Sequence, residues 1–385
     1  MKTGYWLLLA VTLLLLGCTA AKSEMTLHIE NAGTTDRENE MVEVAWEKVQ
    51  QQLSLTADQT ILITDEDGQQ LPYQLVTNGT ATTETVIFPV TLKAGEKRTY
   101  RITTGVPRPF QPLVYGRLVP ERKDDFTWEN NRTAFRVYGP ALKATGEISN
   151  GMDYWAKKSD ALIIDKWYKD DLSGVASYHV DHGEGLDFYK VGRTLGLGMT
   201  APVDHDTLCL GHNFVTAEIL DNGPLRFTFR LTYDPYLAGG QMITETRLIS
   251  LDAYSLFNKV TNLFETDTAL LTVATGIVMP EEKPEEKAAT TTFGDLSGII
   301  AYETPADAAN GIIFTAAIHP DGFDSVKVIN GHFAGINSYQ PGKPYSYHAG
   351  GGWSKAGFDN FDAWVTFIKN EKEKMDQPLT VIIDE

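Results

Sequence analysis

The segment "YHVDHGEGLDFYKVGRT", residues 178–194, gathers histidines, acids, tyrosines and cations around three glycines. Side chains of these types transfer protons and recognise charged substrates near neutral pH. If residues 176–182 form a strand, both histidines reach one cavity only when the chain bends at Gly183 or Gly185. We therefore predict a functional site whose candidate catalytic residues are His179, His182, Glu184, Asp187 and Tyr189. The alternative is a solvated acidic turn on the surface of a sheet.

Two reactions fit these residue types. A lyase that acts on a uronic-acid sugar needs a base, an acid and a group that neutralises the sugar carboxylate. Histidine and tyrosine suit the first two roles, and the neutralising candidates are Asn130, Lys190 and Arg193. A glycoside hydrolase needs two carboxyl groups instead, and the candidates are Glu129, Asp181, Glu184 and Asp187. The residues permit both reactions, and we favour the lyase because histidines, tyrosines and cations occur together.

A second polar cluster is "ERKDDFTWENNRTAFRVYG". Trp128, followed by Glu129 and Asn130, is typical of a sugar-binding platform, in which an indole face packs on the sugar and polar groups bind hydroxyls. A core tryptophan beside an exposed charged turn fits equally well. Arg132 and Arg136 fall on one face of a strand, so one is predicted to bind a uronate, with Arg136 as the substrate-binding candidate, while the other forms a salt bridge with Glu129 or Asp125.

A glycine-rich segment near the end of the chain, "YSYHAGGGWSKAGF", adds two substrate-binding candidates. Three glycines separate His348 from Trp353 and let the backbone approach a ligand closely. The spacing does not match a nucleotide-binding glycine motif, and no parallel βαβ pattern surrounds it. Asp204 and Asp206 lie near two histidines without a standard zinc spacing. We predict no metal or cofactor, with a calcium ion held by aspartate oxygens as the open alternative.

The composition excludes one class of partner and the N-terminus suggests a location. The formal net charge of −18 opposes binding to nucleic acid, whose affinity rests on neutralising phosphates. "MKTGYWLLLAVTLLLLGC" reads as an export signal over residues 1–18 that ends in a lipobox, with Cys18 as the lipidated residue. We therefore expect a lipid-anchored protein of the cell envelope on the periplasmic face of the outer membrane, with residues 19–25 as a tether.

The rest of the chain predicts an all-β protein. Residues 26–104 contain short alternating runs separated by Asp-Gly and Gly turns, which indicates an N-terminal β-sandwich. The stretch "MVEVAWEKVQQQL" within it has Met41, Val44, Ala45 and Val49 near helical spacing, and we still predict a strand followed by a loop. Residues 105–113 hold three prolines and read as a linker. Residues 114–385 contain longer strand-like runs, which suit a large antiparallel β-supersandwich that carries the site.

Three motifs together resemble a known family. "RLVPERKDDFTWENNRTAFRVYGPAL", "YWAKKSDALIIDKWY" and "YHVDHGEGLDFYKVGRTLGLG" are similar to the bacterial exported proteins known as the domain of unknown function 4861 family. The resemblance implies a setting of polysaccharide degradation, especially of pectin, and a supersandwich like that of galactose mutarotase. A shared fold does not fix a function.

Three functions follow as hypotheses. The first is an enzyme that acts on acidic, pectin-like oligosaccharides, either as a lyase or as a hydrolase. The second is a non-catalytic glycan-binding lipoprotein, for which aromatic platforms matter more than the histidines; its candidates are Trp128, Trp155, Trp167 and Trp353. The third is a structural protein of the envelope, which leaves the cluster at 178–194 unexplained.

Overall fold

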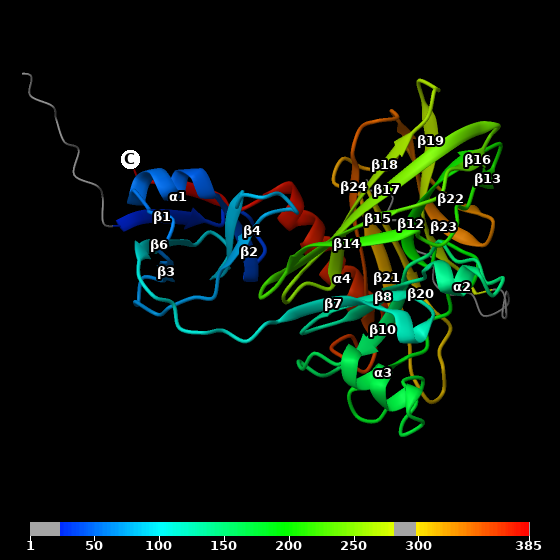
Figure 1. The fold of residues 1–385 in the computed structure, drawn as a ribbon, viewed down its shortest axis with the longest axis horizontal. Helices are drawn as coiled ribbons and strands as arrows, with labels where there is room; N and C mark the ends of the chain where they lie inside the picture. The colour runs from blue at the N-terminus through cyan, green and yellow to red at the C-terminus, as the bar shows by residue number, and fades with distance from the viewer. Residues whose placement is uncertain (1–23, 281–297, 385) are drawn as a thin grey trace, which may run out of the picture.

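The computed structural model describes residues 24–280 and 298–384, and these residues form mainly antiparallel β-sheets (Figure 1). The all-β prediction is confirmed. The predicted signal and Cys18 lie outside the described residues. Within the described residues, no helix is long and apolar enough to cross a membrane.

Two sheets enclose one apolar core near the N-terminus. The four-stranded sheet has the order β25-β1-β6-β3, with bounds Thr380–Ile383, Glu24–Glu30, Lys97–Thr104 and Ile61–Thr64. The three-stranded sheet has the order β2-β5-β4, with bounds Arg37–Ala45, Thr85–Leu92 and Gln74–Val76. In β1 every second side chain enters the core, which is the alternation expected of a half-buried strand.

Two features of this region differ from the prediction. The residues after β2 form a helix, α1 (Trp46–Leu53), where we expected a loop. Its buried residues Val49 and Leu53 are four apart, so they lie on one helical face and pack into the core. In addition, β25 pairs with β1, so the chain returns from the large region to complete the first sheet.

Three larger sheets build the rest of the molecule. The eight-stranded sheet follows the path β14-β15-β17-β18-β24-β21-β20, with β16 beside β17; its bounds are Thr216–Asn222, Arg226–Thr232, Gln241–Asp252, Phe257–Glu265, Tyr345–Trp353, Ile313–Ile318, Ile299–Glu303 and Tyr236–Ala238. One five-stranded sheet has the order β13-β12-β19-β23-β22; its bounds are Thr207–Leu208, Leu197–Asp204, Leu271–Val278, His332–Tyr339 and Ser325–Ile329. A single apolar core joins these sheets to the third one.

The third sheet, which we call the site sheet, has the order β11-β10-β9-β8-β7, with bounds Gly185–Asp187, Asp153–Lys157, Ala134–Val137, Asp125–Asn130 and Val114–Val119. Its central strands are buried on both faces. In β8, Phe126 and Trp128 enter the large core, and the alternate residues Asp125, Thr127 and Glu129 are equally buried on the other face. The sheet therefore has one apolar face and one buried polar face.

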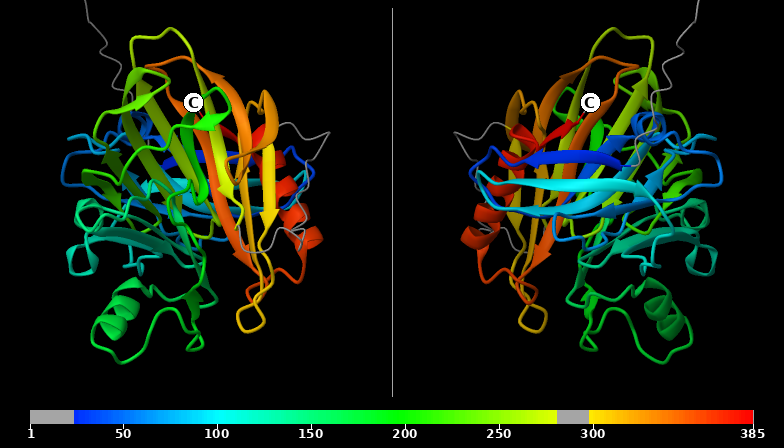
Figure 2. Two further views of the ribbon diagram at one scale, coloured as in Figure 1. Left: turned by 90° about the vertical axis from the view of Figure 1, so that its right-hand side faces the viewer. Right: turned by 90° about the vertical axis from the view of Figure 1, so that its left-hand side faces the viewer.

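Helices cover what the sheets leave exposed. Helix α3 (Ile164–Leu172) packs beside β8 and β10 through Trp167 and Tyr168 (Figure 1). Helix α4 (Phe361–Asp376) lies along β20 and β21, and Figure 2 shows it in red beside the yellow and orange strands. The remaining helical segments are short: α2 (Pro140–Lys143) and a 3-10 turn (Pro120–Arg122).

Helix α4 offers a direct test of the packing. Trp364 is fully buried and stacks on Phe257 and Phe314, with ring centres 5.8 and 6.4 Å away. We expect Trp364→Ala to lower the free energy of unfolding by about 3–5 kcal/mol, because it leaves a cavity between helix and sheet. Thermal denaturation would measure the loss. Thr366→Ala, an exposed change in the same helix, is the control, and an equal effect of both changes would contradict this account.

Candidate functional site

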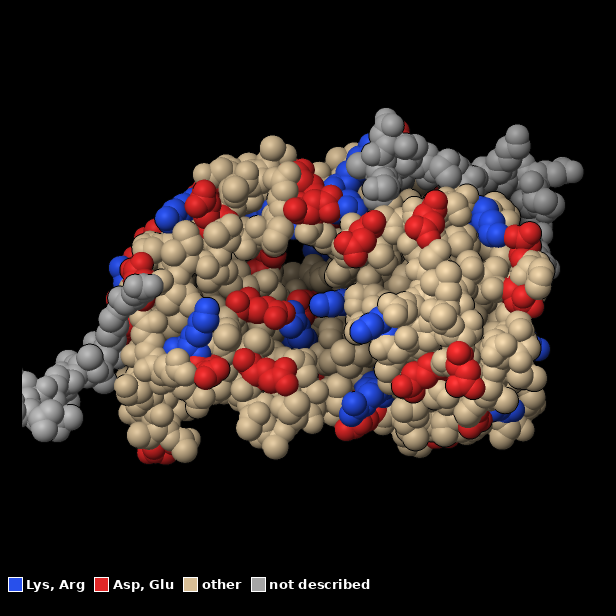
Figure 3. All heavy atoms as spheres, turned by 90° about the horizontal axis from the view of Figure 1, so that it is seen from above, with Lys and Arg blue, Asp and Glu red and all other residues tan. Residues whose placement is uncertain are grey.

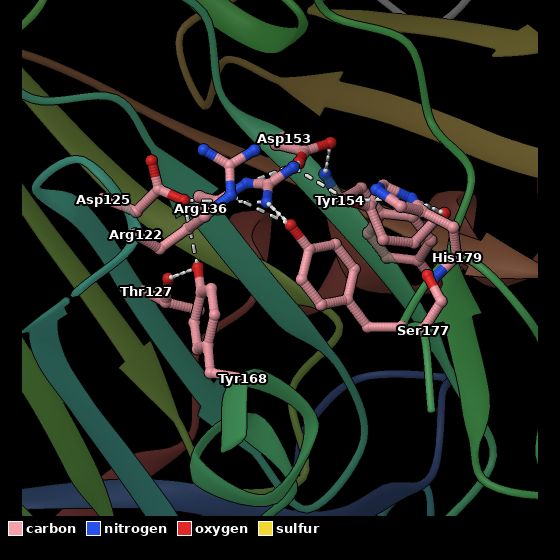
Figure 4. A network of polar contacts seen from close by, with 11 residues as sticks. Arg122, Asp125, Thr127, Arg136, Asp153, Tyr154, Tyr168, Ser177 and His179 are labelled. Atoms are coloured by element: carbon pink, nitrogen blue, oxygen red, sulfur yellow. Dashed lines mark hydrogen bonds and ion pairs between the residues drawn. The ribbon is translucent and has the colours of Figure 1, made fainter. Parts of the chain in front are cut away.

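A buried guanidinium forms the centre of the polar face of the site sheet. The Nη2 of Arg136 lies 2.6 Å from Oδ2 of Asp153 and 2.8 Å from Oδ2 of Asp187. A third carboxylate, that of Asp125, lies 3.7 Å from Nη1 (Figure 4). These four residues come from β8, β9, β10 and β11, so the arginine joins neighbouring strands by charge as well as by their backbone hydrogen bonds.

Aromatic rings enclose this charge. The guanidinium carbon of Arg136 lies 5.2 Å from the ring centre of Trp155 and 5.7 Å from that of Tyr178. Rings at this distance attract a cation and exclude water from it. The Tyr168 hydroxyl of α3 donates a hydrogen bond to Asp125 at 3.2 Å, and this bond links the helix to the cluster (Figure 4).

The cluster contains more acid than its single buried guanidinium balances. Burial raises the pKa of Asp125 to about 6, although Arg136 and Arg122 act in the opposite direction. Burial also raises the pKa of Asp187 well above its usual range, and the neighbouring Asp153 adds to the increase. The Oδ1 atom of Asp125 is buried and has no hydrogen-bond partner among the described residues.

His179 lies at the edge of this cluster with its side chain 58% exposed. Its Nδ1 lies 2.9 Å from the backbone oxygen of Asp187 and 3.6 Å from the Oδ2 atom of the same residue. The ring packs on Tyr178 at 4.5 Å between centres. The contact of Nδ1 with the backbone oxygen of Asp187 orients the imidazole, and an oriented, exposed histidine is a candidate for general acid–base chemistry.

The other residues predicted around 178–194 do not gather around His179, although His182 and Glu184 line one small cavity beside α3. Residues 176–182 form turns where we expected a strand, and Nε2 of His182 lies 3.2 Å from the Ser177 carbonyl oxygen. Glu184 accepts hydrogen bonds from Lys166 at 2.9 Å and from Trp167 at 3.2 Å, so it is bound to α3. Tyr189 is buried, and it lines a cavity that does not include His179. These side chains therefore do not share one cleft with His179, although their catalytic roles stay predictions.

A pocket of about 260 Å³ lies beside the C-terminal end of β10, whereas Asp153 of the Arg136 cluster begins this strand. We call it the basic pocket. Its lining includes four cations, one acid and three aromatic side chains: Arg132, Lys157, Lys158, Lys355, Asp160, Tyr154, Trp353 and Phe358. On the face drawn in Figure 3, by contrast, acidic and basic side chains are interspersed around a hollow. An excess of cations in a protein of net charge −18 indicates a local preference for an anion.

One buried ion pair holds the inner wall of the basic pocket. The Nζ of Lys157 donates to Oε2 of Glu129 at 2.7 Å and to the backbone oxygen of Asn130 at 2.6 Å. Glu129 also accepts hydrogen bonds from the backbone N–H groups of Ile163 and Ile164, at 2.7 and 2.9 Å, where α3 begins. Burial raises the pKa of Glu129 and lowers that of Lys157. A carboxylate from β8 thus caps a helix and fixes a lysine of β10.

The exposed cations of the pocket differ in how they are held. Lys158 pairs with Asp181 at 2.8 Å, which joins the pocket to the segment that carries His179. Lys355 donates to the Ala309 backbone oxygen at 2.5 Å. Among the described residues, the Arg132 guanidinium forms no ion pair with an acid, and its backbone N–H donates to the Asn130 side chain. The pocket therefore holds a guanidinium that is available to an anionic ligand.

Trp353 forms part of the pocket wall without exposing its ring. The side chain is fully buried, and Nε1 donates to the Asn310 backbone oxygen at 2.7 Å. The ammonium groups of Lys158 and Lys355 lie 5.5 and 5.7 Å from its ring centre. The indole thus holds two cations at the pocket by cation–π attraction.

Several predicted binding residues have structural partners instead. Trp128 is fully buried, and its indole N–H donates to Asn258 at 2.7 Å, so the prediction of a sugar platform is wrong and the core alternative holds. Asn130 donates to two backbone oxygens, those of Asp252 and Ser255, at 2.6 and 2.7 Å. Of the two arginines weighed for a uronate, Arg136 is the one in a salt bridge, and Arg132 lines the pocket.

The remaining candidates lie elsewhere. His348 is partly buried in β24, where desolvation lowers its pKa to about 4. Lys190 lines a second cavity, and Arg193 is exposed. Within the described part of the chain, no group of three or more His, Cys, Asp or Glu side chains is placed to hold a metal ion. Sequence reasoning missed Lys158 and Lys355, although "AKKSD" and "WSKAG" set lysines beside the chosen aromatic residues.

Asp125 gives the polar face a pH dependence. Its raised pKa means that the folded protein binds this proton more tightly than the unfolded chain does. The stabilisation is complete below the unfolded pKa of about 4 and is lost as the pH rises through about 6. We expect the wild type to lose about 1 kcal/mol relative to Asp125→Asn between about pH 5 and about pH 7, measured by urea unfolding. Asp234→Asn changes an exposed residue and should leave the pH dependence of the wild-type unfolding free energy intact. If this free energy changed equally with pH in all three proteins, the raised pKa would not belong to Asp125.

Comparison with known proteins places the chain in a family. The solved structures that it resembles include an alpha-mannosidase from Enterococcus faecalis V583, with a TM-score of 0.44, 8% identity and coverage of 94% of this chain and 46% of that chain. A glycosyl hydrolase family 38 protein from Enterococcus faecalis gives a TM-score of 0.46, 8% identity and coverage of 94% and 48%. The chain thus spans about half the length of these structures.

The sequence matches are more extensive. "Uncharacterized protein P7" of Formosa agariphila is 30% identical over 321 residues, which cover 78% of each chain. The profile of the family described as "Domain of unknown function (DUF4861)" matches residues 29–381. The resemblance seen in the three sequence motifs is thereby confirmed, and the chain belongs to the DUF4861 family.

Proposed function

We propose that this protein is a carbohydrate-active enzyme that binds the carboxylate of a uronic-acid sugar in the basic pocket and cleaves the chain there. The observation that carries the proposal is the pocket itself, in which Arg132, Lys158 and Lys355 face one acid, Asp160. Cations attract a carboxylate most strongly where aromatic walls reduce its hydration. A pectic or similar acidic oligosaccharide carries such a carboxylate, and the largely buried rings of Tyr154 and Phe358 form the apolar wall behind the cations.

Each cation has a distinct part in this recognition. The guanidinium of Arg132 presents two parallel N–H donors, which match the two oxygens of a carboxylate. Lys355 and Lys158 are point charges held at the pocket by the Trp353 ring. Lys157 is bound to Glu129 and keeps the wall in place, so it contributes shape and background charge.

The composition of the pocket favours elimination over hydrolysis. In β-elimination a base removes the proton next to the carboxylate, the bond to the leaving oxygen breaks, and that oxygen gains a proton. The cations stabilise the negative charge that collects on the carboxylate in the transition state. Hydrolysis by the usual route needs two carboxyl groups at the bond, and Asp160 is the one acid in the lining of the pocket.

His179 remains our candidate for proton transfer. It is exposed, and its Nδ1 contacts the backbone oxygen of Asp187. His179 does not itself line the basic pocket; the Lys158–Asp181 ion pair joins its segment to the pocket. A non-catalytic glycan-binding protein is the alternative, and it would use the same pocket without turnover.

The charge of Arg132 provides the first test. Purified protein lacking residues 1–18 is incubated with pectic and other uronate oligosaccharides. The ultraviolet absorbance of a 4,5-unsaturated uronate is followed, and the masses of the products are determined by mass spectrometry. We expect Arg132→Ala to raise KM at least about tenfold, since a charged hydrogen bond contributes roughly 1.5–3 kcal/mol. Arg230→Ala, which removes an exposed arginine paired with Glu218, should leave KM unchanged.

The outcomes separate the alternatives. Methyl-esterified substrate should bind to the wild type at least as weakly as the free acid binds to Arg132→Ala, because the ester lacks the charge that all three cations attract. If the products had gained the mass of water and showed no new absorbance, the enzyme would be a hydrolase and not a lyase. Binding without any product would favour the non-catalytic protein, and no binding of any acidic glycan would refute the proposal.

A further inference from the structure

Two of the four cations in the basic pocket are already neutralised within the protein. Lys157 pairs with Glu129 at 2.7 Å, and both side chains are fully buried. Lys158 pairs with Asp181 at 2.8 Å, with the two side chains 31% and 19% exposed. Because each pair has no net charge, the two pairs leave the overall charge of the pocket unchanged.

The other three charged side chains set this overall charge. Within residues 24–280 and 298–384, Arg132 and Lys355 form no ion pair with an acid, and Asp160 forms none with a cation. Lys355 donates to a backbone oxygen, that of Ala309, which leaves its charge in place. Two unpaired cations and one unpaired acid give the pocket a single excess positive charge. One carboxylate group would therefore neutralise it.

Asp160 is placed to act on a ligand in the pocket. It lies in the segment between β10 and α3, it is exposed, and it lines the pocket. Its charge also acts on the pocket wall: burial lowers the pKa of Lys157, and the carboxylates of Glu129 and Asp160 oppose this change. A carboxylate accepts hydrogen bonds from sugar hydroxyls and repels a second anionic group.

We infer that Asp160 is a specificity-determining residue that limits the basic pocket to one carboxylate. The inference rests on the proposed function, since that carboxylate must belong to the uronate. Once Arg132 and Lys355 bind it, the pocket has no excess positive charge, and the carboxylate of a neighbouring free uronate is repelled by Asp160. The pocket therefore favours a free uronate beside an uncharged sugar, such as a methyl-esterified uronate, over a run of free uronates.

The test compares two ligands of nearly equal size that differ by one charge. Binding of digalacturonic acid and of its monomethyl ester is measured by isothermal titration calorimetry at about 0.1 M salt, where the Debye length is about 10 Å. We expect the wild type to bind the two ligands within about twofold of each other, because the second carboxylate gains no attraction. In Asp160→Asn the pocket has a second excess positive charge, so the diacid should bind roughly three- to fivefold more tightly than the monoester. At about 1 M salt, where the Debye length is about 3 Å, this difference should disappear.

A matched control removes the same charge far from the pocket. Asp267→Asn changes an exposed acid that forms no ion pair with any cation in the described part of the chain. Asp267 follows β18, whereas Leu256 of the pocket precedes this strand of nine residues, so about 30 Å separates the two. Because this distance exceeds the Debye length, the control should bind both ligands as the wild type does.

The outcomes separate this inference from the proposed function. If Asp160→Asn kept the wild-type ratio of affinities, or if Asp267→Asn changed the ratio equally, Asp160 would not set the specificity. A wild type that bound the diacid several-fold more tightly than the monoester would also overturn the inference. In each of these cases, weaker binding of both ligands to Arg132→Ala would leave the proposed function standing. If the wild type bound neither ligand, the proposed function and the inference would fail together.

Discussion

The arrangement of the site depends on the hydrogen bonds and the ion pair that the buried carboxylate of Glu129 accepts. It receives the ammonium of Lys157 and the first backbone N–H groups of α3, so one side chain connects β8, β10 and the helix. A buried carboxylate is costly unless donors surround it, and here three donors do. The same contact holds the end of β10 where the basic pocket opens and holds α3 over the Arg136 cluster. The basic pocket and the Arg136 cluster are thus held in place by the same contacts of Glu129.

The polar face of the site sheet explains why its strands are hard to interpret. A sheet that packs on an apolar core with one face usually exposes the other face to water. Here the second face carries Asp125, Glu129 and Arg136 and is nevertheless buried, because α3 and its aromatic residues cover it. When only the sequence is known, charged residues in a strand suggest that their face of the sheet is exposed to solvent, which is not the case here. This is why Glu129 and Arg136 were predicted to bind substrate.

The all-β class and the family followed from the sequence, because alternating runs and long motifs are local properties. The helical character of residues 46–53 competed with neighbouring strand signals, and tertiary packing of Val49 and Leu53 decides in favour of a helix. The pocket could be inferred only in part. Arg132 and Trp353 were noticed, but their meeting with Lys158 requires β24 to lie near the end of β10, and that long-range contact has no local signature.

The pairing of β25 with β1 has a consequence for the biogenesis of the protein. Strand β1 is synthesised long before its partner β25, because the two strands span residues 24–30 and 380–383. During synthesis, that edge of β1 stays unpaired until the residues between the two strands have been made. An unpaired edge is a template for aggregation, so the late pairing of β25 covers an edge of β1 that is open during synthesis.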